Sequence, residues 1–122
     1  MAYKKVLVIE DEEVLRKIIV RNLSAHGVEA LEAASVEEGL GQLENGPELV
    51  LLDINLPGQS GWELLRTLRN RGQELPTVIV SAVRVSPDRL EEFKPLAYLP
   101  KPFPIEALLR IVNGNQEEED GA

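Results

Sequence analysis

Residues 49–58 read Leu-Val-Leu-Leu-Asp-Ile-Asn-Leu-Pro-Gly. The first four residues are all apolar, which is typical of a β-strand that is covered on both faces. Pro57 and Gly58 mark a turn shortly after that strand. Asp53 ends the apolar run, although burial alone would disfavour a carboxylate there. The stretch therefore predicts a buried parallel strand with a functional carboxylate at its carboxyl end.

Short runs rich in β-branched residues and leucine, three of them continuously apolar, alternate with helical patterns along the chain. Further runs occupy 6–9, 28–33, 77–80 and 97–99, and segments with helical spacing lie between them. Five strand–helix units in about 115 residues predict an α/β fold, a single doubly wound sheet of five parallel strands with five helices. Pro87 and Pro95 limit the fourth helix to about two turns, so we expect it to be short or irregular. In the first helix, Leu15, Ile18, Ile19 and Leu23 are expected to share one face.

Length and composition are those of one soluble domain. The chain has 122 residues, of which 43% are apolar, and it has no cysteine, so disulfides and thiolate metal sites are excluded. We expect a domain over residues 1–113, followed by an acidic, disordered tail at 114–122. The first apolar run, 6–9, is too short for a signal peptide or a membrane span, which favours a cytoplasmic location.

The charge of the chain narrows the choice of partner. Its formal net charge is −8, and four of the acidic residues lie at 117–120. No segment of the sequence carries a cluster of lysine and arginine, so the positive patch typical of nucleic-acid binding is absent. An acidic surface also disfavours anionic membranes. The expected partners are therefore proteins, neither nucleic acid nor membrane.

Polar side chains stand just after four of the five predicted strands. They are Glu10 and Asp11, then Asp53, Ser81 and Lys101. Because ligands of such sheets bind at the carboxyl ends of the strands, we expect these side chains to converge. Crowded carboxylates repel one another, and Mg²⁺, which prefers oxygen ligands, would relieve that repulsion. With an ammonium and a hydroxyl beside the cation, the group could hold a phosphoryl group.

Four stretches of the sequence resemble a known family. They are Val-Leu-Val-Ile-Glu-Asp-Glu at 6–12, Leu-Leu-Asp-Ile-Asn-Leu-Pro-Gly at 51–58, Ile-Val-Ser-Ala at 79–82 and Tyr-Leu-Pro-Lys-Pro-Phe at 98–103. In this order and spacing they resemble the signature stretches of the response-regulator receiver domains of two-component signalling, in the chemotaxis-regulator-like superfamily. The resemblance covers roughly residues 4 to 113. It implies a flavodoxin-like sheet with strand order 2-1-3-4-5.

The resemblance also implies a role for each site residue. Asp53 would accept a phosphoryl group, in a Mg²⁺-dependent reaction, from the phosphohistidine of a sensor histidine kinase or a phosphotransfer protein. The resulting aspartyl phosphate would change the conformation and so regulate the binding of a downstream protein target. The implied metal site consists of Asp11, Asp53 and the backbone carbonyl of Asn55, with Glu10 acting through a water. Ser81 and Lys101 would contact phosphoryl oxygens, Ser81 and Tyr98 would form the switch, and the Lys101–Pro102 bond would be cis.

Some positions depart from the usual pattern of the family. Glu10 replaces the commoner aspartate, Ser60 stands where an aspartate is frequent, and Val83 is apolar where many relatives are polar. The short segment around the fourth helix puts the mode of partner binding in question.

Two alternatives remain open. The first is a receiver-like protein-interaction module that works without phosphorylation. The second is a small enzyme or redox carrier, but Gly39-Leu-Gly41 lacks the third glycine of a dinucleotide site and acids occupy the loop after the first strand. We therefore expect no enzyme beyond self-catalysed phosphotransfer and dephosphorylation. No output domain follows residue 113, and the start at Met1 favours a complete protein that signals by protein contact.

Overall fold

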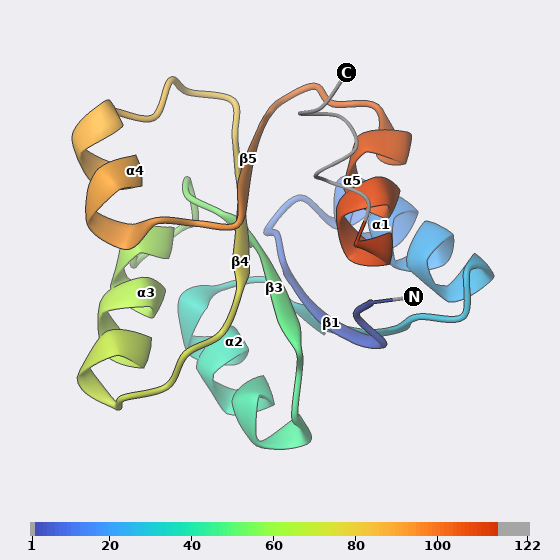
Figure 1. Cartoon of the computed structure of the whole chain (residues 1–122), viewed down its shortest axis with the longest axis horizontal. Coiled ribbons are helices and arrows are strands. Elements are labelled where there is room, and N and C mark those ends of the chain that lie inside the picture. The colour runs from blue at the N-terminus through green and yellow to red at the C-terminus, as the bar shows by residue number, and fades with distance from the viewer. Residues whose placement is uncertain (1, 115–122) are drawn as a thin grey trace.

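The computed structural model describes residues 2–114. Strands and helices alternate along the chain (Figure 1). In order, the elements are β1 Lys5–Ile9, α1 Glu13–Ala25, β2 Glu29–Ala33, α2 Val36–Gln42, the 3-10 turn η1 Leu43–Asn45, β3 Leu49–Asp53, α3 Gly61–Asn70, β4 Thr77–Ser81, α4 Pro87–Phe93, β5 Ala97–Pro100 and α5 Ile105–Asn113. All but Gly114 of the predicted tail lies outside the described residues, so the division into domain and tail stays a prediction. No helix within residues 2–114 is both long and apolar enough to cross a lipid bilayer.

The five strands form one parallel sheet in the order β2-β1-β3-β4-β5. This confirms the predicted strand order. Helices α1 and α5 cover one face of the sheet, and α2, α3 and α4 cover the other (Figure 1). The strand order reverses between β1 and β3, which are direct neighbours. Their carboxyl ends therefore form the crevice in which doubly wound folds bind ligands.

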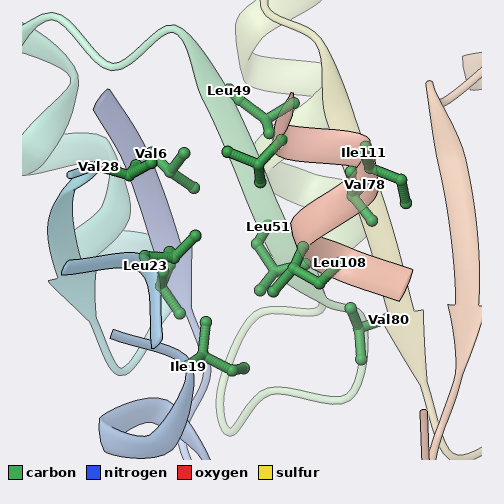
Figure 2. Packing of buried hydrophobic residues seen from close by; sticks show 12 residues of the cluster. Val6, Ile19, Leu23, Val28, Leu49, Leu51, Val78, Val80, Leu108 and Ile111 are labelled. Carbon is green, nitrogen blue, oxygen red and sulfur yellow. The ribbon is translucent and has the colours of Figure 1, made fainter. Parts of the chain in front are cut away.

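Alternate residues of the central strands enter two separate cores. On β1, Val6 and Val8 face α1 and α5, whereas Leu7 and Ile9 face the opposite helices. In Figure 2, residues of β3 and β4 meet α1 and α5; those drawn include Leu51, Val80, Ile19, Leu23 and Leu108. A strand covered on both faces has no polar side, which explains the uninterrupted apolar runs.

The buried face of α1 is narrower than the sequence pattern predicts. Ile19 and Leu23 are buried and Leu15 is half-buried, but Ile18 is 45% exposed. The prediction that Ile18 shares their face is wrong in this respect. Residues 15, 19 and 23 follow a spacing of four along the line where α1 meets the sheet, and Ile18 lies beside that line.

Helix α4 has only seven residues, which confirms the prediction of a short fourth helix. The hydroxyl of Ser86 accepts a hydrogen bond from the amide of Arg89 at 3.3 Å and so caps its first turn, next to Pro87. The helix ends at Lys94, whose backbone is left-handed with φ of 46°. The chain can then turn directly into β5.

Candidate functional site at the carboxyl ends of the strands

The backbone at the site continues the pairing of the sheet beyond the strands. The amide of Glu10 donates to the carbonyl of Ala33 on β2 at 3.0 Å, and the amide of Lys101 donates to the carbonyl of Ser81 on β4 at 2.9 Å. Asp53 is itself the last residue of β3. Each of these side chains therefore starts from a backbone that a neighbouring strand holds in place.

Lys101 joins the two buried carboxylates. Its Nζ lies 2.8 Å from Oε1 of Glu10 and 3.1 Å from Oδ2 of Asp53, and both acidic residues are only 3% exposed. The other oxygen of each carboxylate accepts a backbone amide two residues further along. Glu12 donates to Oε2 of Glu10 at 3.1 Å, and Asn55 donates to Oδ1 of Asp53 at 3.0 Å. These bonds hold both carboxylates in fixed orientations.

Burial and the crowding of charges shift the acidity of the site. Burial, together with the charge of Asp53, raises the pKa of Glu10 to about 7, against the opposing hydrogen bonds from Lys101 and from the amide of Glu12. Burial by itself would lower the pKa of Lys101, but its hydrogen bonds to Glu10 and Asp53 outweigh that effect and raise it. Lys101 therefore stays an ammonium, whereas burial disfavours the ionised form of Glu10.

A third carboxylate completes an acidic cluster. Glu10, Asp11 and Asp53 each place one carboxylate oxygen within 4.8 Å of the others. Asp11 is exposed, and within residues 2–114 its side chain makes no hydrogen bond or ion pair. Three oxygen donors at this separation are the ligand type that a hard divalent cation requires.

Ser81 lies at the end of β4, and its hydroxyl is bonded within the loop that follows. Its buried hydroxyl donates to the carbonyl of Val83 at 2.7 Å and accepts the amide of the same residue at 3.1 Å. It borders a cavity of about 270 Å³ that Asn55 and Val83 also line. Tyr98 lies opposite Ile79 in β5 and is half-buried against the core on the α2, α3 and α4 side. The Ser81 hydroxyl is thus engaged by its own loop, and the switch roles of Ser81 and Tyr98 stay predictions.

Two residues near the site were not singled out as site residues from the sequence. Gly61 begins α3 and donates its amide to the carbonyl of Ile54 at 3.0 Å, and a Cβ there would lie 2.7 Å from the carbonyl oxygen of Asp53. Arg16 donates to the carbonyl of Glu10 at 2.9 Å. Nothing in the sequence distinguishes it from the other cations of α1.

Trp62 of α3 packs against α4. Its ring stacks on Phe93 with the ring centroids 5.4 Å apart, and the guanidinium of Arg89 lies 5.7 Å above it. Trp62 also lines the cavity beside Ser81 and Asn55. Its fluorescence can therefore report changes in that cavity.

Comparison with known proteins now gives the family. Residues 6–113 match the response regulator receiver domain family. The chain is 35% identical to the uncharacterized transcriptional regulatory protein YkoG of Bacillus subtilis, over 95% of this chain and 55% of that protein. It is 33% identical to the phosphate regulon transcriptional regulatory protein PhoB of Klebsiella pneumoniae, over 88% of this chain and 50% of PhoB.

Solved structures agree in fold. The receiver domain of the Francisella response regulator 1452 is 28% identical with a TM-score of 0.83, covering 95% of this chain and 98% of that one. A CheY-like receiver domain protein from Methanospirillum hungatei is 28% identical with a TM-score of 0.80, covering 98% of both chains.

The chain therefore belongs to the receiver domains of two-component response regulators. It spans about half the length of the curated relatives it matches. Receiver domains as a class are signalling modules rather than conventional enzymes. Glu10, Asp11, Asp53 and Lys101 converge as the sequence predicts, while their individual roles remain to be tested.

Proposed function

We propose that Asp53 is the phosphoacceptor and that it receives a phosphoryl group from the phosphohistidine of a sensor histidine kinase or a phosphotransfer protein. The observation that carries this proposal is the contact of 3.1 Å between the ammonium of Lys101 and Asp53, inside the acidic cluster. An ammonium beside an acceptor carboxylate offsets the negative charge that the incoming phosphoryl group brings. Its second contact, with Glu10, keeps it at the site.

The acidic cluster fits a bound Mg²⁺. Asp11, Asp53 and the backbone carbonyl of Asn55 would hold the ion directly, and Glu10 would act through a water. The fit rests on three carboxylate oxygens within 4.8 Å of one another and on the unengaged side chain of Asp11. When bound, the ion supplies positive charge for the phosphoryl oxygens. It would also favour the ionised form of Glu10, which burial disfavours.

The transfer moves one phosphoryl group between two proteins. An oxygen of Asp53 forms a bond to phosphorus while the bond between phosphorus and the donor imidazole nitrogen breaks, and the imidazole leaves with that electron pair. Lys101 stays beside the group as its counter-charge. Water later hydrolyses the aspartyl phosphate and returns the carboxylate. No free substrate is turned over, so the domain catalyses only its own phosphotransfer and dephosphorylation.

Phosphorylation would then act on Ser81. Turning toward the phosphoryl group, its hydroxyl would give up its hydrogen bond to the carbonyl of Val83, so the loop before α4 would rearrange. Tyr98 could rotate into the vacated space and alter the surface between α4 and α5. A downstream protein target would recognise that surface. The net charge of −8 favours a protein over nucleic acid or a membrane as partner of this domain, and a cytoplasmic location is part of the proposal.

Intact-mass analysis tests this function. The wild type, incubated with acetyl phosphate and Mg²⁺, should gain one phosphoryl group that is lost at alkaline pH, and Asp53→Asn should gain none. Asp88→Asn is the matched control, because Asp88 is an exposed aspartate in the first turn of α4, outside the acidic cluster. It should be modified like the wild type. A wild type that stays unmodified across several donors would favour the interaction module that works without phosphorylation.

A further inference from the structure

One carboxylate of the acidic cluster is held less firmly than the other two in the part of the chain that the structure describes. Glu10 and Asp53 are each fixed by Lys101 and by a backbone amide, but the exposed side chain of Asp11 makes no such bond within residues 2–114. Its position is therefore set by the backbone from which it projects. The peptide that joins Glu10 to Asp11 decides where this carboxylate lies.

The peptides on both sides of Glu10 are held. In the peptide before it, the amide of Glu10 donates to the carbonyl of Ala33, as in an extended strand pair. In the Glu10–Asp11 peptide, the carbonyl of Glu10 accepts a hydrogen bond from Nη1 of Arg16 at 2.9 Å. Nε of the same guanidinium lies 3.0 Å from Oε1 of Glu32 on β2. The Arg16 side chain is only 14% exposed. One planar group thus ties the acidic loop to α1 and to the edge strand β2.

We propose that Arg16 is a positioning residue for the cation site, which acts by fixing the Glu10–Asp11 peptide through the Glu10 carbonyl. This inference rests on the proposed Mg²⁺ site. Arg16 itself would touch neither the cation nor the phosphoryl group. Groups that orient the ligands of a metal without binding it commonly change metal affinity by about 10- to 100-fold when they are removed.

The direction in which Mg²⁺ affinity changes when Arg16 is removed distinguishes a positioning role from an effect of its charge. A guanidinium near a cation site repels the cation, so charge alone predicts that removing Arg16 tightens Mg²⁺ binding. Loss of positioning predicts the opposite, because Asp11 would no longer be held where it can share the ion. The two explanations therefore differ in direction.

Lys17 provides a matched control on the same helix. Its Nζ lies 3.0 Å from Oε1 of Glu32, the same atom that Arg16 contacts, but it makes no bond to the acidic loop and its side chain is 51% exposed. Lys17→Gln and Arg16→Gln remove the same charge from neighbouring positions and disturb the same partner. Only Arg16→Gln breaks the contact with the Glu10 carbonyl.

Calorimetric titration with Mg²⁺ on wild type, Arg16→Gln and Lys17→Gln tests the inference. Binding should weaken about tenfold in Arg16→Gln and should be unchanged or tighter in Lys17→Gln. The amide NMR signals of Asp11 and Glu12 should shift in metal-free Arg16→Gln and stay in place in Lys17→Gln. Equal or tighter binding in Arg16→Gln would overturn the inference, whereas a wild type that binds no Mg²⁺ would overturn the proposed metal site itself.

A third variant covers the case in which Arg16→Gln is unfolded. Arg16→Lys keeps the charge but lacks the planar fork that reaches both the Glu10 carbonyl and Glu32. It should bind Mg²⁺ more weakly than the wild type as well. If Arg16→Lys bound Mg²⁺ as tightly as the wild type, the charge at position 16 would explain the affinity without the planar fork. That result would contradict a positioning role.

Discussion

Replacing Gly61 with alanine tests how closely α3 must approach the end of β3. A Cβ at this position would lie 2.7 Å from the carbonyl oxygen of Asp53 and 3.0 Å from Cα of Ile54. Both are backbone atoms and cannot swing aside as a flexible side chain can. We therefore expect the first turn of α3 to move away from β3, and the backbone that carries the acceptor carboxylate to move with it.

The magnitude follows from two opposing effects. Overpacking of a well-packed contact costs roughly 1–3 kcal/mol, and exchanging glycine for alanine in a helix returns up to about 1 kcal/mol. With the full offset, the free energy of unfolding of Gly61→Ala should thus fall by up to about 2 kcal/mol. Because the displaced backbone belongs to Asp53, phosphorylation by acetyl phosphate should slow as well.

Gly41→Ala is the matched control for this prediction. Gly41 lies inside α2, and no atom within 4 Å would meet a Cβ there. That variant should be more stable than the wild type by about 0.5–1 kcal/mol, with phosphorylation unchanged. Urea unfolding, followed by circular dichroism, measures the free energy of unfolding of both variants. The midpoints are compared provided that the dependence of this free energy on urea concentration is the same. Equal stability of Gly61→Ala and Gly41→Ala would refute the close approach of α3 to β3.

Three more predictions concern the site. In metal-free protein, the raised pKa of Glu10 destabilises the fold as pH rises from 4.5 to about 7. The free energy of unfolding of Glu10→Gln should therefore increase relative to that of the wild type over this range, by at most about 3 kcal/mol. Urea unfolding at several pH values measures this difference, and a difference that stays constant with pH would contradict the prediction. Asp11→Ala should lose the Mg²⁺-dependent rise in melting temperature, because it removes a direct ligand; a rise as large as that of the wild type in a thermal scan would exclude this role. Ser81→Ala should still accept phosphate, but NMR shifts across residues 96–109 should respond less, since the switch hydroxyl is gone; equal shifts in wild type and variant would separate Ser81 from the switch.

The order of strands and helices could be read from the sequence. Three of the five predicted runs are continuously apolar, as expected for strands covered on both faces. All five observed strands lie within one residue of the predicted runs at both ends. Alternation of strand and helix implies parallel pairing, so residues after each run must share one edge of the sheet. The sequence alone therefore predicts that Glu10, Asp53 and Lys101 lie together at that edge.

Local patterns could not decide which atoms make contact at that edge. Periodicity tells which side of an element is apolar, but the buried line of α1 excludes Ile18 because the angle at which the helix crosses the sheet is a tertiary property. The contact of Arg16 with the Glu10 carbonyl likewise depends on how α1 leaves the loop. Several cations on that helix satisfy the sequence pattern equally well.

The sequence by itself therefore determined the alternating α/β architecture and the set of polar residues at the carboxyl ends of the strands. Only the tertiary structure decided that Lys101 contacts both Glu10 and Asp53, that Ser81 is bonded to its own loop, and that Asp11 has no direct partner among the described residues 2–114. The physical reason is that the pattern of apolar residues within each segment predicts which of its own residues are buried. Hydrogen-bond partners depend instead on distances between segments far apart in the chain, and those distances exist only once the five strands are ordered and the helices packed against them.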